Sequence, residues 1–237
     1  MEVLKNLDFG RAFRELLPKL FGDAFSIVIT VTIVGFLLAI VIGFLLALAR
    51  VSKNKILNKV VVVFQEIIRG TPLLVQLVYV YYVVPLLIEV IFALFGQEID
   101  VTMTALTAGI IGMSINYGTY ISEVIRSAIL AIDQGQTEAA LALGLSKRQA
   151  MFRIVIPQAF KNSVPVFGNY LVMMVKDTSL MAYITAQEFL MTTKAYTSQT
   201  FLIIESYTIL AGVYLIICIP LSILVKYIEK ICNRSRR

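Results

Sequence analysis

Five long apolar stretches constrain the fold of this chain more than any other feature. They cover residues 24–49, 70–88, 101–122, 162–187 and 206–225, and the fourth is interrupted by Lys176 and Asp177. A helix needs about 20 apolar residues to cross the hydrocarbon core of a bilayer. Because lipid offers the backbone no hydrogen-bond partners, each stretch must satisfy its own backbone groups as a helix. We therefore expect an all-α membrane protein with five transmembrane helices.

The composition excludes an ordinary soluble domain. Apolar residues make up 59% of the chain and charged residues 15%, whereas soluble domains average about 45–50% and about 25%. The chain has no histidine, which excludes histidine-based catalysis, and its two cysteines show no metal-ligand spacing. We expect neither a metal nor a cofactor.

The distribution of lysine and arginine predicts the topology, because basic residues gather in cytoplasmic loops. They follow the first, third and fifth stretches, at Arg50, Lys53, Lys55 and Lys59, at Arg126, Lys147, Arg148, Arg153 and Lys161, and at Lys226, Lys230, Arg234, Arg236 and Arg237. The opposite side holds only Lys194 besides the segment 1–22, which resembles an interfacial amphipathic helix and carries four basic residues of its own. The other loops agree on an external N-terminus and a cytoplasmic C-terminus. The net charge of +6 follows from this topology and requires no nucleic acid.

Residues 59–96 are almost continuously apolar, and as one helix they would extend roughly 55 Å. The hydrocarbon core is only about 30 Å thick, so a break is required. Arg69-Gly70-Thr71-Pro72 provides it, because proline removes a backbone donor. We expect a helix over 60–68, with Glu66 and Arg69 able to pair along one face, joined at an angle to a span over 73–88.

A polar insert at 131–160 separates the third and fourth stretches, and its residues predict a compact knob of two short helices. Thr137 can cap a helix that opens at Glu138, and Gly144 can end it in the left-handed conformation. Ser146 and Gln149 form a capping-box pattern that starts a second helix, which Pro157 should limit.

The insert EAALALGLSKRQAMFRIVIP resembles the EAA loop of permease subunits of bacterial ATP-binding-cassette (ABC) importers. The segments RGTPLLVQ, INYGTYISEVIRSAI and KDTSL are similar to those of the polar amino acid subfamily, and Ile156 is a minor departure. The resemblance implies one permease domain over 1–237 with a type I (MetI-like) fold in the cytoplasmic membrane. It also implies ATPase coupling through Glu138, Ala139, Ala140, Gly144, Leu145 and Pro157.

The same resemblance implies the partners: two cytoplasmic ATPases, a second permease that is identical or related, an external solute-binding protein and the membrane lipid. The chain has no G-x-x-x-x-G-K-[ST] phosphate loop. It is therefore not itself an enzyme and must take its energy from a partner. A gradient-driven secondary transporter or channel is the alternative. Such transporters commonly consist of paired halves, whereas this sequence shows no internal repeat. An intramembrane hydrolase is a further alternative, but the sequence has no pair of Asp or Glu residues within the apolar stretches at a spacing that would support hydrolysis.

Polar residues within the stretches are candidates for the translocation pathway, because ionisable groups in a membrane normally face the bundle interior. They are Gln76, Tyr79, Asn116, Tyr117, Tyr120, Glu123, Lys176 and Asp177. Asn116, Tyr120 and Glu123 share one helical face. A zwitterionic amino acid needs an anion for its amine and a cation for its carboxylate, and Glu123 or Asp177 with Lys176 could supply both. A structural Glu123–Arg126 pair is the alternative, and the substrate stays open between a basic amino acid and glutamine or another polar one.

Overall fold

The computed structural model describes residues 7–234, and every regular element in that range is helical. The first six residues of the N-terminal segment and Ser235 to Arg237 of the basic tail lie outside the described range. The α-helices are α2 (Phe9–Lys19), α3 (Phe25–Val51), α4 (Lys55–Arg69), α5 (Leu73–Val78), α6 (Val84–Leu94), α7 (Ala105–Leu130), α8 (Gln134–Ala142), α9 (Lys147–Ala150), α10 (Ile156–Asp177), α11 (Phe189–Thr200) and α12 (Ile203–Arg234).

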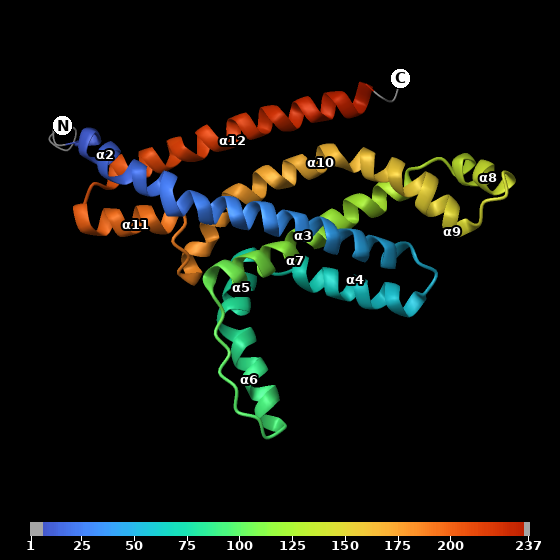
Figure 1. Ribbon diagram of the computed structural model, residues 1–237, viewed down its shortest axis with the longest axis horizontal. Coiled ribbons are helices and arrows are strands. Elements are labelled where there is room, and N and C mark those ends of the chain that lie inside the picture. The colour runs from blue at the N-terminus through green and yellow to red at the C-terminus, as the bar shows by residue number, and fades with distance from the viewer. Residues whose placement is uncertain (1–6, 235–237) are drawn as a thin grey trace.

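Four long helices, α3, α7, α10 and α12, run lengthwise through the molecule (Figure 1). The knob of α8 and α9 lies at one end, and α2 and α11 lie at the other. Helix α4 runs alongside α3, whereas α5 and α6 leave the bundle in a different direction. The break expected at Arg69–Pro72 is confirmed, because α4 ends at Arg69 and α5 begins at Leu73.

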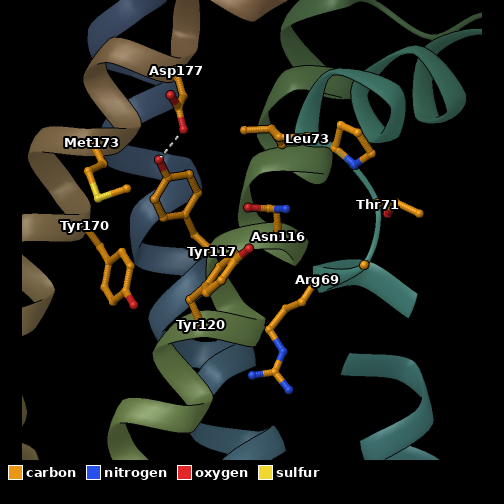
Figure 2. A pocket seen from close by; sticks show the side chains of 11 residues that line it. Arg69, Thr71, Leu73, Asn116, Tyr117, Tyr120, Tyr170, Met173 and Asp177 are labelled. Atoms are coloured by element: carbon orange, nitrogen blue, oxygen red, sulfur yellow. Dashed lines mark hydrogen bonds between the residues drawn. The ribbon is translucent and has the colours of Figure 1, made fainter. Parts of the chain in front are cut away.

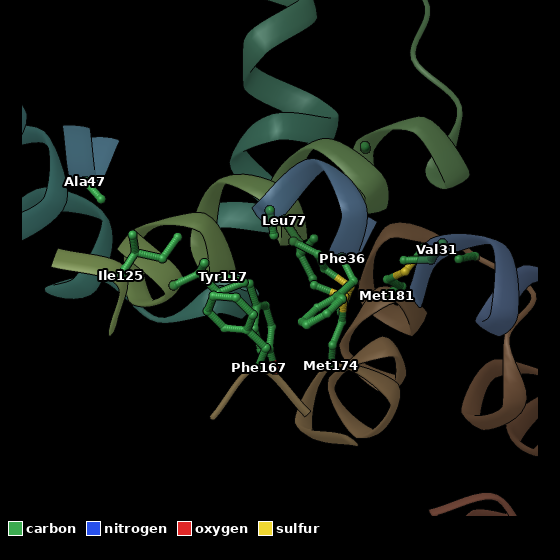
Figure 3. Packing of buried hydrophobic residues seen from close by; sticks show 14 of the residues in the cluster. Val31, Phe36, Ala47, Leu77, Tyr117, Ile125, Phe167, Met174 and Met181 are labelled. Carbon is green, nitrogen blue, oxygen red and sulfur yellow. The ribbon is translucent and has the colours of Figure 1, made fainter. Parts of the chain in front are cut away.

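The core of the bundle is the contact between α3 and α7, which two glycines make close. A Cβ added at Gly43 would lie 2.6 Å from Ile121 Cγ2, and one at Gly118 would lie 2.8 Å from Ile42 Cγ2. Small residues let helices approach closely in a membrane, where packing and interhelical hydrogen bonds favour association. Around this contact lies an apolar cluster that includes Phe36, Leu77 and Met174 (Figure 3).

A second apolar cluster joins α2 to α11 and α12. Ala12 and Leu16 are buried on one side of α2, and two carboxylates fasten the helix in place. Glu205 accepts a 2.8 Å hydrogen bond from the backbone N–H of Asp8, and Glu15 accepts a 3.0 Å bond from the Tyr196 hydroxyl. Helix α2 is thus anchored at the end of the molecule opposite the knob.

Three helical stretches in the described residues are both long and apolar enough to cross a membrane: 9–51, 73–94 and 203–231. They contain the first, second and fifth stretches expected from the sequence, the second nearly to its full extent. Helices α7 and α10 have 26 and 22 residues, which suffices to span by length. Their polar residues, including the buried Asn116 and the half-buried Asp177, lower the mean hydropathy of both helices.

Candidate functional site

A cavity of about 720 Å³ lies where the break between α4 and α5 meets α7 and α10. Its lining combines one carboxylate, one guanidinium and three phenol groups (Figure 2). The lining residues are Arg69, Gly70, Thr71, Pro72, Leu73, Asn116, Tyr117, Tyr120, Tyr170, Met173 and Asp177. The cavity can therefore offer both signs of charge to a small polar molecule.

Asp177 is the last residue of α10, and its carboxylate faces α7. The Tyr117 hydroxyl donates a 2.7 Å hydrogen bond to Asp177 Oδ2. Tyr117 is only 2% exposed, and its ring meets that of Tyr170 edge-on with the centroids 6.1 Å apart. The phenol therefore holds one carboxylate oxygen and leaves the other to accept a cation, because an ionised carboxylate has about four acceptor sites.

A second cavity of about 500 Å³ adjoins the first and shares Arg69, Tyr120 and Tyr170 with it. Glu123 lines this second cavity and accepts hydrogen bonds from the Arg126 Nε at 3.0 and 3.1 Å. The pairing of Glu123 with Arg126, the structural alternative for Glu123, is thus present in a residue that also lines a cavity. Asn116, Tyr120 and Glu123 together follow the two cavities along α7.

Gln76 and Tyr79 face a third, mostly apolar groove of about 380 Å³ between α4, α5 and α7, which shares only Thr71 with the first cavity. Gln76 accepts a 3.0 Å hydrogen bond from Asn116 Nδ2 and donates to the carbonyls of Ile68 and Thr71 at 2.6 and 2.9 Å. It therefore braces the break between the helices. Tyr79 is 49% exposed and lines neither of the two connected cavities.

Lys176 lines none of these three spaces and is exposed on α10. The structure does not bring it together with Asp177 in the cavity, because adjacent residues point to different sides of a helix. Arg69 provides the cation of the cavity instead. The i, i+3 pairing expected for Arg69 is confirmed, with Nη2 2.6 Å from Glu66 Oε1.

The sequence reasoning also missed Tyr170 and Met173, which line the first cavity. They precede Asp177 by seven and four residues, so the three share one face of α10. That spacing could have identified them once Asp177 was chosen.

The knob contains α8, a glycine turn and α9. Gly144 has φ of +82°, and the N–H groups of Gly144 and Leu145 bond to the carbonyls of Leu141 and Ala140 at 2.9 and 3.1 Å. These are the two bonds of a Schellman motif, so the predicted left-handed stop is confirmed. The capping box of Ser146 and Gln149 is confirmed as well.

Two details of the predicted knob are wrong. Helix α8 begins at Gln134 with Asp133 as its cap, rather than at Glu138 with Thr137 as its cap. The Asp133 carboxylate accepts from the Gly135 N–H at 2.7 Å, which stabilises a start one turn earlier. Pro157 does not end the second helix, because the chain stays helical from α9 into α10 through a π-helical turn at Met151–Val155. The wider turn accommodates a ring that would otherwise clash with the preceding carbonyls.

The surface of the knob is uneven in its exposure. Glu138, Ala139, Gly144 and Pro157 are exposed and Leu145 is half-buried. Ala140 is only 4% exposed, so its side chain packs inside the knob. Leu143, just before the turn, is 83% exposed and presents an apolar side chain that the sequence reasoning did not select.

Residues 39–232, which include both cavities and the knob, match the family described as the binding-protein-dependent transport system inner membrane component. The chain belongs to this family. It is therefore an inner membrane permease component of an ABC transporter, and the ATPase is a different subunit.

Two relatives and one solved structure illustrate the likeness of this permease. It is 34% identical over 207 residues to the L-cystine transport system permease protein TcyB of Bacillus subtilis, covering 87% of this chain and 83% of that protein. It is 33% identical over 200 residues to the glutamine transport system permease protein GlnP of Escherichia coli K12, covering 84% and 87%. It also superposes on a chain from the crystal structure of an amino acid ABC transporter with histidines, with a TM-score of 0.79 and 31% identity over 95% of this chain and 99% of that one. The predicted fold of an ABC importer permease is thereby confirmed.

Proposed function

We propose that this permease forms the translocation pathway of an ATP-driven importer for a polar or basic amino acid. The observation that carries the proposal is the cavity of about 720 Å³ in which the Asp177 carboxylate and the Arg69 guanidinium face the same space. An amino acid carries an ammonium and a carboxylate, which these groups complement. The relatives named for cystine and glutamine transport support the same class of substrate.

The chain crosses the membrane five times, with its N-terminus outside and its C-terminus in the cytoplasm. The five crossings are α3, the segment 73–94, α7, α10 and α12. Helix α4 leads into the second of these crossings. The basic loops after α3, α7 and α12 lie on the cytoplasmic side with the knob, as the distribution of lysine and arginine predicts. Helix α2 and α11 lie at the outer surface.

Asp177 binds the substrate ammonium, and Tyr117 fixes the orientation of its carboxylate. Asn116, Tyr120 and Glu123 line the path from this point towards the cytoplasm. Gln76 stabilises the break between α4 and α5. Lys176 and Tyr79 lie near the pathway and do not line it. This division follows from which side chains line the connected cavities.

The knob couples the permease to the ATPase. Glu138, Ala139, Gly144, Leu145 and the exposed Leu143 provide the docking surface, Ala140 packs the knob from within, and Pro157 lies at its base. The complete importer contains two ATPases, a second copy of this permease and an external solute-binding protein that delivers the amino acid.

Amino acid uptake into proteoliposomes that contain the permease and its ATPase, with the solute-binding protein supplied on the opposite side of the membrane from the knob, tests this function. We expect uptake that requires ATP on the knob side of the membrane and that persists when ionophores dissipate ion gradients. Uptake that continues without ATP and stops with ionophores would instead establish the gradient-driven alternative.

A further inference from the structure

Arg69 stands where the two connected cavities meet. It lines both of them, together with Tyr120 and Tyr170, and we call these three residues the neck. Figure 2 shows Asp177 and Arg69 at opposite ends of the group, with Asn116 and Tyr120 between them. A substrate that leaves Asp177 towards Glu123 must therefore pass the Arg69 guanidinium.

The guanidinium of Arg69 is incompletely used. Its Nη2 donates to Glu66 Oε1 at 2.6 Å, while its buried Nε has no hydrogen-bond partner among the described residues. A guanidinium has five N–H donors in a planar fork that matches a carboxylate. The side chain thus has donors available for a second carboxylate.

The present partner of Arg69 is only loosely held. The Glu66 side chain is 67% exposed, compared with 27% for Arg69, and solvent-exposed ion pairs contribute little stability. A carboxylate that arrives from the cavity side can therefore replace Glu66 at small cost.

The backbone of Arg69 is held firmly, which a recognition residue requires. Arg69 ends α4, and the Gln76 amide clamps the carbonyls on either side of it, those of Ile68 and Thr71. Asn116 in turn holds Gln76. The following residue, Gly70, packs so closely that an added Cβ would lie 2.8 Å from the Glu66 carbonyl oxygen.

The charges near the neck favour an anion. Arg50, Arg69 and Arg126 all lie close enough to Glu123 to interact with it electrostatically. Three guanidinium groups therefore lie near two carboxylates, those of Glu66 and Glu123. We propose that Arg69 binds the α-carboxylate of the substrate at the neck and that Glu66 occupies this position when no substrate is present. The inference rests on the proposed function, and it makes a free α-carboxylate a requirement for binding in the pathway.

Equilibrium dialysis of the purified permease–ATPase complex, without any solute-binding protein, tests this inference. The probes are radiolabelled L-glutamine, L-cystine, L-histidine and L-arginine, each competed with unlabelled amines that lack the carboxylate, such as histamine and agmatine. We expect the wild type to bind an amino acid and to reject its amine. Arg69→Gln should bind the amino acid about 10-fold or more weakly with the amine unchanged, and Arg69→Lys should fall between the two.

Glu66→Gln separates recognition from a structural ion pair. Because it removes the competing carboxylate, it should bind the amino acid several-fold more tightly than the wild type. Arg11→Gln, which breaks the ion pair with Glu15 on α2, is the matched control and should leave binding unchanged.

Three results would overturn the inference: a wild type that binds none of the four amino acids, an Arg69→Gln variant that keeps the wild-type preference for the amino acid over its amine, or a Glu66→Gln variant that binds as weakly as Arg69→Gln. The proposed function itself fails on a different result, the absence of ATP-driven uptake by the wild type. A complex that transports with ATP but retains its selectivity in Arg69→Gln would refute the neck alone.

Discussion

The Tyr117 hydroxyl lies 2.7 Å from Asp177 Oδ2 and donates a hydrogen bond to it across the interface of α7 and α10. This bond joins the middle of one long helix to the end of another. Asp177 is followed at once by the 3₁₀-helical turn Thr178–Ile184, so the carboxylate lies where the α-helix tightens. The bond therefore sets both the position of the acid in the cavity and the packing of the two helices.

Asp177→Asn should reduce amino acid uptake by about 10-fold or more, since a hydrogen bond to a charged group contributes about 1.5–3 kcal/mol. Tyr117→Phe should reduce uptake less, because the carboxylate remains but loses its orientation. Tyr227→Phe, at a residue of α12 that is 63% exposed and lines neither cavity, is the control. Initial uptake rates in proteoliposomes give the comparison, and unchanged rates in Asp177→Asn would make Asp177 a structural residue only.

The predicted topology can be read from two exposed serines at opposite ends of the molecule, Ser146 in the knob and Ser198 on α11. In a background with Cys218 and Cys232 replaced by alanine, Ser198→Cys should react with a membrane-impermeant maleimide added to intact cells. Ser146→Cys should react only after the membrane is opened. The reverse labelling pattern would show that the knob lies outside the cell and α11 in the cytoplasm, opposite to the predicted topology.

Gly144→Val should uncouple ATP hydrolysis from transport. The position has φ of +82° and open space around an added Cβ, so the strain comes from the backbone alone, roughly 1–2 kcal/mol per residue in this region. Gly144→Asn is the matched variant, because asparagine tolerates the left-handed conformation. We expect Gly144→Asn to remain coupled and Gly144→Val to lose coupling, measured as amino acids taken up per ATP hydrolysed. Equal coupling in both variants would show that the left-handed turn is not required.

Glu188 gives a pH dependence of stability. It is fully buried at the start of α11, and burial raises its pKa to about 7 although the N–H groups of Leu190 and Met191 bond to it at 2.8 Å. The folded state then holds a proton that the unfolded state releases, so this stability is present at low pH and is lost as pH rises through about 7. Its size is at most about 3 kcal/mol.

Thermal unfolding in detergent checks this dependence between about pH 4.5 and about pH 7. Glu188→Gln should flatten the fall in Tm across that range, whereas Glu229→Gln on the exposed face of α12 should not. A wild type whose Tm rises through the same range would contradict the protonated Glu188.

Local chemistry in the sequence predicted the elements that depend on few residues. The break at Arg69–Pro72, the left-handed Gly144 and the Ser146 capping box each follow from backbone preferences that act within a few positions. The same reasoning failed at Thr137, because a stronger cap at Asp133 stood four residues earlier. It failed at Pro157, because a π-helical turn absorbed the proline.

The arrangement of side chains around the cavity depended on contacts that the sequence does not display. Nothing in the spacing of Gln76 indicated that it would turn to the carbonyls of Ile68 and Thr71. Lys176 and Asp177 are neighbours in the chain, yet only Asp177 faces the cavity, and its cationic counterpart is Arg69 from another helix. Long-range pairing of this kind is set by how α4, α7 and α10 pack.

The most direct test of the account is purification of the tagged permease from native membranes, followed by mass spectrometry and an ATPase assay with the solute-binding protein and a panel of amino acids. We predict a co-purifying ATPase whose turnover rises with one polar or basic amino acid, and the loss of that ATPase in a Leu143→Asp variant. A permease that purifies alone, with no ATPase activity and no response to any amino acid, would contradict the account.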